Sequence, residues 1–146
     1  NGREQVQSCA AEAQGITVKE QPYGYEVILP HLMPKRNHRN HTVFLLEPLT
    51  YALKEFTVAH PICRLEYALI WFIYEYTEDT PIHCIRDYDN IETKEVLDII
   101  NSFFLLDDGG AFCELHYSTR RGNRTCTRVI ISSDIGLVSC QKIKGN

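Results

Sequence analysis

Two groups of aspartates flank one short segment of the chain. Asp87 and Asp89 stand one residue apart, and Asp107 and Asp108 are adjacent further along. If Asp87 and Asp89 end a strand, their side chains point to the same side, because side chains alternate along a strand. Carboxylate oxygens that converge on one point are the ligands that Mg²⁺ and Mn²⁺ prefer. These acids are therefore candidate ligands of a divalent cation that would activate water and polarise a phosphoryl oxygen.

An alternative without a metal explains the same residues as ordinary helix boundaries. Asp89 can cap the helix that follows, and Glu92, three positions later, can complete a capping box. Asp107 and Asp108 precede two glycines and can form a solvated turn. They would then lie at the negative end of the helix, where a carboxylate is disfavoured by roughly 0.3 to 1 kcal/mol. The helix itself is indicated by apolar residues at helical spacing, namely Val96, Ile100, Phe103 and Phe104.

The segments that must position these acids show mixed helix and strand patterns. In chain order, we expect a helix over Arg3–Gln14, then two short strands or one broken strand over Ile16–Lys19 and Tyr23–Leu29. These are followed by a strand "TVFLL" from Thr42, a helix from Glu47 to about Ala59, and a buried central strand over Arg64–Tyr76. The last two strands, "AFCELHYS" and "CTRVIIS", flank "TRRGN", which predicts a β-hairpin with Gly122 and Asn123 at its turn. The expected fold class is α+β, with helices packed on a mixed sheet.

Composition narrows the class of protein. With 146 residues, 44% hydrophobic and 23% charged, the chain has the composition of one soluble globular domain. Its longest apolar run, Ala68–Tyr74, is far shorter than the roughly 20 residues of a membrane helix, so we expect no membrane contact. A net charge of −4 has the wrong sign for binding nucleic acid over a broad face. Six cysteines without a Cys-x-x-Cys pair favour a cytoplasmic location.

The beginning of the chain suggests a piece of a longer protein. It starts at Asn1 and Gly2 without a methionine or a signal-like apolar segment. We expect residues 1–20 to form an N-terminal helix and linker, as the end of an upstream region, and residues 21–146 to form the main domain.

The stretch "RDYDN", followed by a helix pattern and "DD", resembles the signature of RusA-type Holliday junction resolvases. Members of that family are small, homodimeric, Mg²⁺-dependent endodeoxyribonucleases that cut four-way DNA junctions. The stretch "VILPHLMPKRN" is similar to the family's first strand and proline-rich loop. The expected elements follow the family's order over roughly Tyr25 to Ser132, including a motif helix between the acidic clusters and the C-terminal hairpin.

The resemblance implies roles for particular residues. Asp87, Asp89 and Asp108 would hold Mg²⁺ or Mn²⁺, and Lys94 would be the family's helix lysine. The domain would then be a structure-selective endodeoxyribonuclease that acts as a homodimer on branched DNA. The residues expected to contact DNA are Arg86, which precedes the acidic motif, Lys35, Arg36 and Arg39 in the basic loop, and Arg120 and Arg121 at the hairpin turn.

One departure from the family pattern leads to a second hypothesis. Lys94 lies five residues after Asp89, one further than the family's lysine, and Thr93 occupies the expected position. One residue of helical shift turns a side chain through roughly 100°. Together with the net charge of −4, this gives the alternative of a catalytically inactive RusA-like module of a larger protein, which would dock on nucleic acid or on a protein partner.

Overall fold

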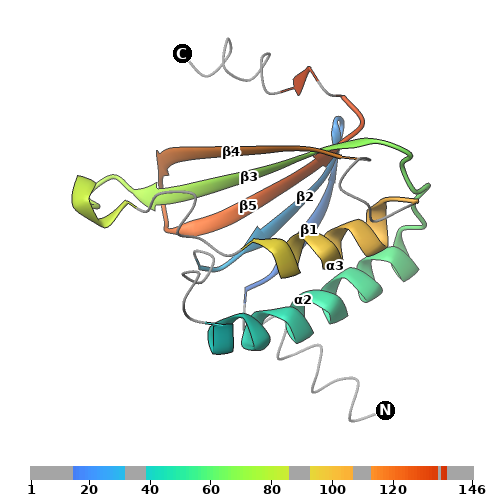
Figure 1. The fold of residues 1–146 in the computed structure, drawn as a ribbon, viewed down its shortest axis with the longest axis horizontal. Coiled ribbons are helices and arrows are strands. Elements are labelled where there is room, and N and C mark those ends of the chain that lie inside the picture. Colours follow the sequence, from blue (N-terminus) through green and yellow to red (C-terminus); the bar gives the residue numbers. More distant parts are fainter. Residues whose placement is uncertain (1–14, 32–38, 86–92, 107–112, 135, 138–146) are drawn as a thin grey trace.

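The computed structural model describes residues 15–31, 39–85, 93–106, 113–134 and 136–137, with no side chains described for residues 39–44. The described elements form a mixed sheet with helices on one face, which confirms the predicted α+β class (Figure 1). They are β1 (Thr17–Gln21), β2 (Gly24–Leu29), α2 (Arg39–Ala59), β3 (Ala68–Thr77), the 3₁₀ turn η1 (Ile82–Cys84), α3 (Lys94–Phe104), β4 (Cys113–Gly122) and β5 (Cys126–Ser132). None of the described helices is long and apolar enough to cross a membrane.

The N-terminal strands form as expected, as an antiparallel pair. Strand β1 begins at Thr17, so the sheet extends across the boundary that we drew between residues 20 and 21. The helix expected over Arg3–Gln14 lies outside the described residues.

The sheet has the strand order β1-β2-β5-β3-β4, with β3 and β4 parallel and the other neighbours antiparallel. The predicted hairpin is therefore wrong: β4 and β5 both form, but β3 lies between them. The reason is the burial of β3, which has nine of its ten residues buried. A strand that is apolar on both faces is stabilised by neighbours on both edges, and this requirement outweighs the local turn pattern.

The predicted strand from Thr42 is also wrong, because α2 already begins at Arg39. The apolar residues Leu49, Leu53 and Phe56 recur at helical spacing and are buried against the sheet. We expected Pro48 near the start of a helix that begins at Glu47, and it lies inside the longer helix α2. The helical periodicity of the whole segment therefore outweighs the strand preference of one short β-branched run.

Helices α2 and α3 cover one face of the sheet. Tyr25 on β2 anchors both of them, with its ring centroid 5.9 Å from that of Phe56 on α2 and 5.0 Å from that of Phe104 on α3. Alternate residues of β3, including Phe72 and Tyr74, belong to this helix-covered core. Strand β3 is thus covered on one face by the helices and paired with a neighbouring strand on each edge.

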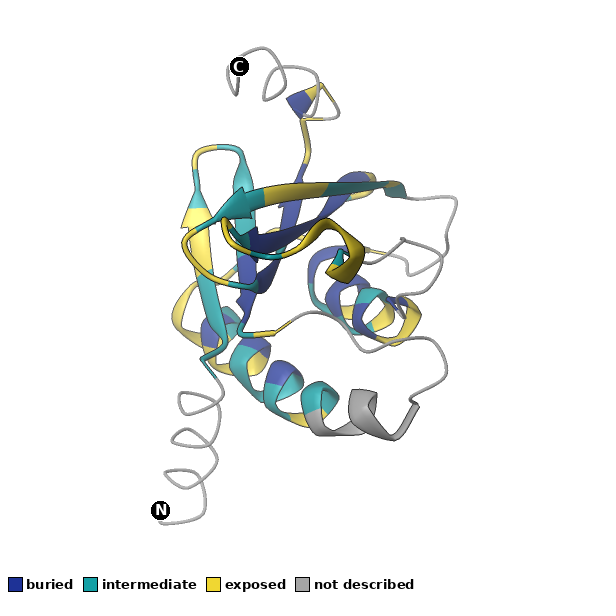
Figure 2. Cartoon of the chain, turned by 90° about the vertical axis from the view of Figure 1, so that its left-hand side faces the viewer, coloured by how far each residue is buried: buried dark blue, intermediate teal, exposed yellow. Residues whose placement is uncertain are grey.

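The opposite face of the sheet carries no described helix, and we call it the open face. A smaller apolar cluster lies there, formed by Leu69, Trp71, Ile73, Ile130 and Leu137. The register places alternate residues of β4 on the same face, because residues paired across strands point to the same side. Figure 2 shows the contrast between the mainly buried central strands and β4, whose residues are intermediate or exposed.

Candidate functional site

Most of the predicted site residues lie outside the described residues. These are Asp87, Asp89 and Asp108, with Arg86, Lys35 and Arg36. Arg39 is the first residue of α2, and its side chain is also outside the described part. Their roles in metal or DNA binding therefore stay predictions. Among the described residues, no three His, Cys, Asp or Glu side chains are grouped so that they could hold a metal ion.

The described residues on either side of the acidic segments are at opposite ends of α3. The segment with Asp87 and Asp89 leads into Thr93, and the segment with Asp108 follows Leu106. From Lys94 to Phe104 the helix rises by about 15 Å, at 1.5 Å per residue. Four extended residues, the separation of Asp89 from Thr93, span at most about 14 Å. A shared metal site thus requires at least one of the two segments to run back alongside the helix.

At the start of α3, Thr93 is buried and the next residue, Lys94, is exposed. The N-cap residue of the helix is Thr93, so the interpretation of Asp89 as the cap is wrong. Thr93 is buried, and its Oγ1 lies 3.2 Å from the hydroxyl of Tyr117 on β4. Lys94 is the first helical residue and is exposed. The position at which the resemblance predicts a lysine is therefore a buried hydroxyl that contacts the sheet.

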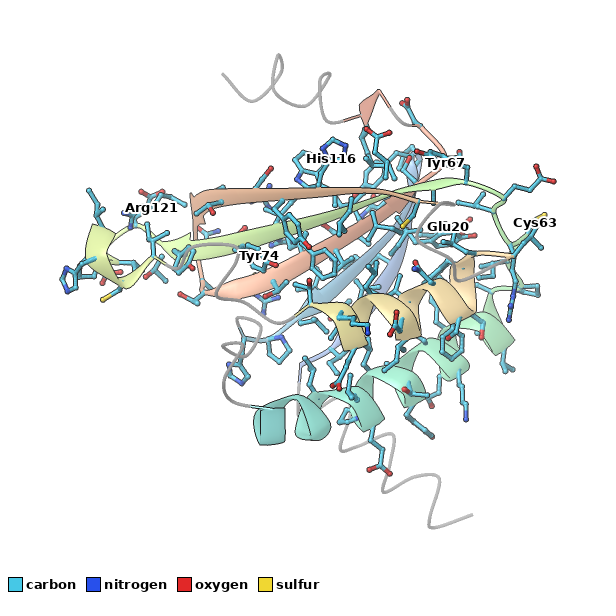
Figure 3. The ribbon with its side chains drawn as sticks, in the orientation of Figure 1. Glu20, Cys63, Tyr67, Tyr74, His116 and Arg121 are labelled. Carbon is cyan, nitrogen blue, oxygen red and sulfur yellow. The ribbon has the colours of Figure 1, made fainter. Side chains whose placement is uncertain are left out.

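Arg121 holds the turn that follows β3. One of its guanidinium nitrogens, Nη1, donates to the carbonyl oxygens of Thr77 at 3.0 Å, Glu78 at 3.3 Å and Thr80 at 2.5 Å. Figure 3 shows this side chain at the end of β4, beside the turn. Arg121 thus fastens the end of β4 to the main chain beyond β3.

Arg120 belongs to an ion-pair network on the open face, which we call the Glu75 cluster (Glu26, Glu75, Arg120 and Arg128). Oε1 of Glu75 accepts hydrogen bonds from Nε of Arg120 at 2.9 Å and from Nε of Arg128 at 3.2 Å. Nη1 of Arg128 also lies 3.6 Å from Oε2 of Glu26. The side chain of Glu75 is only 5% exposed, so two guanidinium groups compensate an almost fully buried carboxylate.

The electrostatics of the Glu75 cluster keep its central carboxylate ionised. Burial raises the pKa of Glu75, but the hydrogen bonds and charges of Arg128 and Arg120 outweigh burial, so the pKa is lowered overall. Burial likewise lowers the pKa of Arg128, whereas Glu75 raises it, and the net change is upward. A carboxylate that is ionised, buried and bound on both sides is a poor proton donor at neutral pH. The cluster is therefore built to hold the strands together rather than to transfer protons.

The sequence carried a signal for this cluster that our prediction did not use. Glu75 is the one charged residue in the ten-residue strand β3, which is otherwise apolar apart from its final threonine. An isolated acid within a buried strand needs a cationic partner, because burying an unpaired charge is strongly unfavourable. Arg120 and Arg128 were available on later strands, but pairing them with Glu75 required the true strand order.

The fold and the site together define an α+β domain with a helix-covered mixed sheet and a buried ion-pair cluster on its other face. Residues 1–135 match a family described as a family of unknown function (DUF6100), and the chain belongs to that family.

No curated protein matches the chain significantly. Among solved structures, the periplasmic domain of Helicobacter pylori MotB (residues 90–256) is similar, with 12% sequence identity, a TM-score of 0.43 and 91% of each chain covered. A likeness this distant carries no argument about function. The resemblance to RusA-type resolvases therefore rests on the sequence motif.

Proposed function

We propose that this domain is a non-catalytic interaction module that docks on a protein partner. One observation carries the proposal: both expected DNA-contacting arginines with described side chains are bonded to other groups of the chain. Arg120 binds the buried carboxylate of Glu75, and Arg121 binds three main-chain carbonyls. Moving Arg120 to a phosphate would leave Glu75 with less compensation for its buried charge. The net charge of −4 also opposes binding to a polyanion.

The arrangement around α3 supports the same proposal. The buried hydroxyl of Thr93 stands where the resemblance to the resolvase family expects a lysine. A resolvase-type site would therefore lack a lysine at the position where the sequence motif expects one.

Thermal denaturation with and without millimolar Mg²⁺ or Mn²⁺ tests the proposal. A metal that binds only the folded state raises stability by RT ln(1 + [L]/Kd), about 2.7 kcal/mol when the ion is at 100 times its Kd. For a module without a metal site we expect no rise in melting temperature and no binding to a synthetic four-way junction at physiological salt. A rise that disappears in Asp89→Asn but persists in Asp98→Asn, a matched change at an exposed position of α3, would overturn the proposal.

A second candidate function is the Mg²⁺-dependent endodeoxyribonuclease that the motif implies. The observation in its favour is the β3–α3–β4 unit, in which Lys94 is exposed in the first turn of α3, directly after the Asp87 and Asp89 segment. In this function the aspartates would hold Mg²⁺ or Mn²⁺, and Lys94 would stabilise charge on the phosphate of branched DNA.

Junction cleavage by the purified protein tests this second candidate. We expect Lys94→Ala and Asp89→Asn to abolish any cleavage while the melting temperature stays within a few degrees, as for site residues outside the core. Glu95→Ala, a change at the neighbouring exposed position, is the control. Absence of cleavage by the parent protein with either metal would exclude this candidate.

We also propose a cytoplasmic location. The four cysteines in the described part of the chain, Cys63, Cys84, Cys113 and Cys126, are all free thiols. Free thiols persist in reducing compartments, whereas oxidising compartments favour disulfides. Fractionation of cells that produce the full-length protein would test this location, and recovery outside the cytoplasm would contradict it.

A further inference from the structure

Strand β4 forms one edge of the sheet in the described structure. It pairs with β3 on one side, and no described strand lies on its other side. The strand is ten residues long, and Leu115 near its start is 38% exposed. A long edge strand presents unpaired main-chain N–H and C=O groups, which readily accept another strand.

The sequence of β4 is complementary to itself when two copies run antiparallel. If the two-fold axis passes through the Tyr117 pair, Glu114 stands opposite Arg120 of the second copy, and the same pair forms again on the other side of the axis. Leu115 then stands opposite Thr119, and His116 opposite Ser118. A closed two-fold interface requires this reciprocity, because each residue must suit the residue that it meets on the identical partner.

Both members of the charged pair have a partner within the chain and keep exposed surface at the edge strand. The register with β3 places Glu114 and Arg120 on the same open face, together with His116. Their side chains are 40% and 50% exposed, and Figure 3 shows His116 on the side of β4 away from the helices. Arg120 binds Glu75 through Nε, and Oε1 of Glu114 lies 2.8 Å from Nε2 of His116. The contact between the two copies would therefore be made by the exposed parts of both side chains.

We propose that a second copy of this chain adds its β4 antiparallel to β4, with the two-fold axis at Tyr117, to form a dimer with one continuous sheet. The two adjacent registers that keep the open faces continuous lose the charge pairing. Moving the axis to His116 places Glu114 opposite Ser118, and moving it to Ser118 places Glu114 opposite Gly122. The proposal goes beyond the proposed function and does not depend on it, since either candidate function is compatible with a dimer.

Sedimentation equilibrium of the parent protein and of Glu114→Arg tests the dimer. The variant places an arginine opposite Arg120 at both symmetric sites, so we expect the dimer dissociation constant to rise at least tenfold. Glu55→Arg, the same change at an exposed position of α2, should leave the dissociation constant unchanged. Far-UV circular dichroism spectra that match the parent's would show that both variants fold. A parent protein that is monomeric at high concentration, or an unaffected Glu114→Arg dimer, would overturn the proposal.

Oxidative cross-linking tests the register. Paired residues of antiparallel strands have Cα atoms about 4.5 to 5.5 Å apart, within the range of a disulfide. The double variant Leu115→Cys, Thr119→Cys should therefore give a covalent dimer on a non-reducing gel, beyond any seen with the native cysteines of the parent. Within one chain these positions are about 13 Å apart, too far for a disulfide. Leu115→Cys alone should give no covalent dimer. If the single variant forms as much covalent dimer as the double variant, the proposed register is wrong.

Discussion

The carboxylate of Glu75 occupies the space that a side chain at position 122 would need. A Cβ atom placed on Gly122 would lie 2.5 Å from Cδ of Glu75 and 2.7 Å from its Oε2. Gly122 is paired with Thr77 at the end of β4, so the absence of a side chain there makes room for the Glu75 cluster. The glycine that we assigned to a hairpin turn thus serves the packing of a buried ion pair.

Gly122→Ala should destabilise the fold. The new methyl group forces the carboxylate away, and its hydrogen bonds from Arg120 and Arg128 weaken. Overpacking of this kind costs typically about 1 to 3 kcal/mol, measurable as a fall in the urea midpoint. Gly136→Ala is the matched control, because its Cβ would lie 3.4 Å from Oδ1 of Asp134, at the edge of ordinary contact. Equal effects of the two substitutions would contradict the account of Gly122.

Truncation of the cluster should follow the order of burial. The side chains of Glu75, Arg128 and Arg120 are 5%, 21% and 50% exposed. Glu75→Ala leaves two arginines without their carboxylate and should cost roughly 3 to 5 kcal/mol, as for a broken buried ion pair. Arg120→Ala should cost no more than about 1 kcal/mol, because water can replace a half-exposed partner. Urea denaturation of the three alanine variants checks this order, and an Arg120→Ala effect as large as that of Glu75→Ala would refute it.

The stabilising effect of Glu75 should depend on pH. Because its pKa in the folded protein is lowered below 4.5, the ionised carboxylate contributes its full stability above about pH 4.5. That contribution is lost as the pH falls through the lower folded-state pKa. We therefore expect the difference in unfolding free energy between the parent and Glu75→Gln to be large at pH 7 and to shrink in acid. If this difference in unfolding free energy grew as the pH fell, the pKa of Glu75 would be raised in the folded protein, which would contradict the prediction.

Cys126 should be the least reactive of the described thiols. It is fully buried, and burial, followed by the charge of Glu75, raises the pKa of its thiol. Since the thiolate is the reactive form, both effects slow its alkylation. Cys63 and Cys84 are exposed, and we expect iodoacetamide to label them at least tenfold faster, as read by peptide mass spectrometry. Rapid labelling of Cys126 in the folded protein would contradict the buried position.

The parts of the fold that depend on local pattern were predictable from the sequence. The buried strand β3 and the apolar stripe of α3, with Val96, Ile100 and Phe104 buried, agree with the prediction. The hairpin was wrong because the short link between β4 and β5 gives no sign that β3 inserts between them. Strand order depends on which strands need two neighbours, and that is a property of the whole sheet.

The candidate site was harder to predict for a similar reason. The aspartate motif is a short local sequence pattern, and its residues lie outside the part of the chain that the structure describes. The Glu75 cluster joins β2, β3, β4 and β5, with Glu75 and Arg128 separated by 53 positions. No local spacing relates such residues, so the cluster could be recognised only after the strands were placed side by side.

The contacts of Arg121 have a consequence for how sequences of this family can diverge. Its partners at Thr77, Glu78 and Thr80 are main-chain carbonyl oxygens, which every amino acid provides. The exposed turn residue Glu78 can therefore be exchanged without loss of the contact, whereas the guanidinium of residue 121 has no equivalent among the other side chains. Natural variation is thus expected to accumulate in the turn while arginine is retained opposite it.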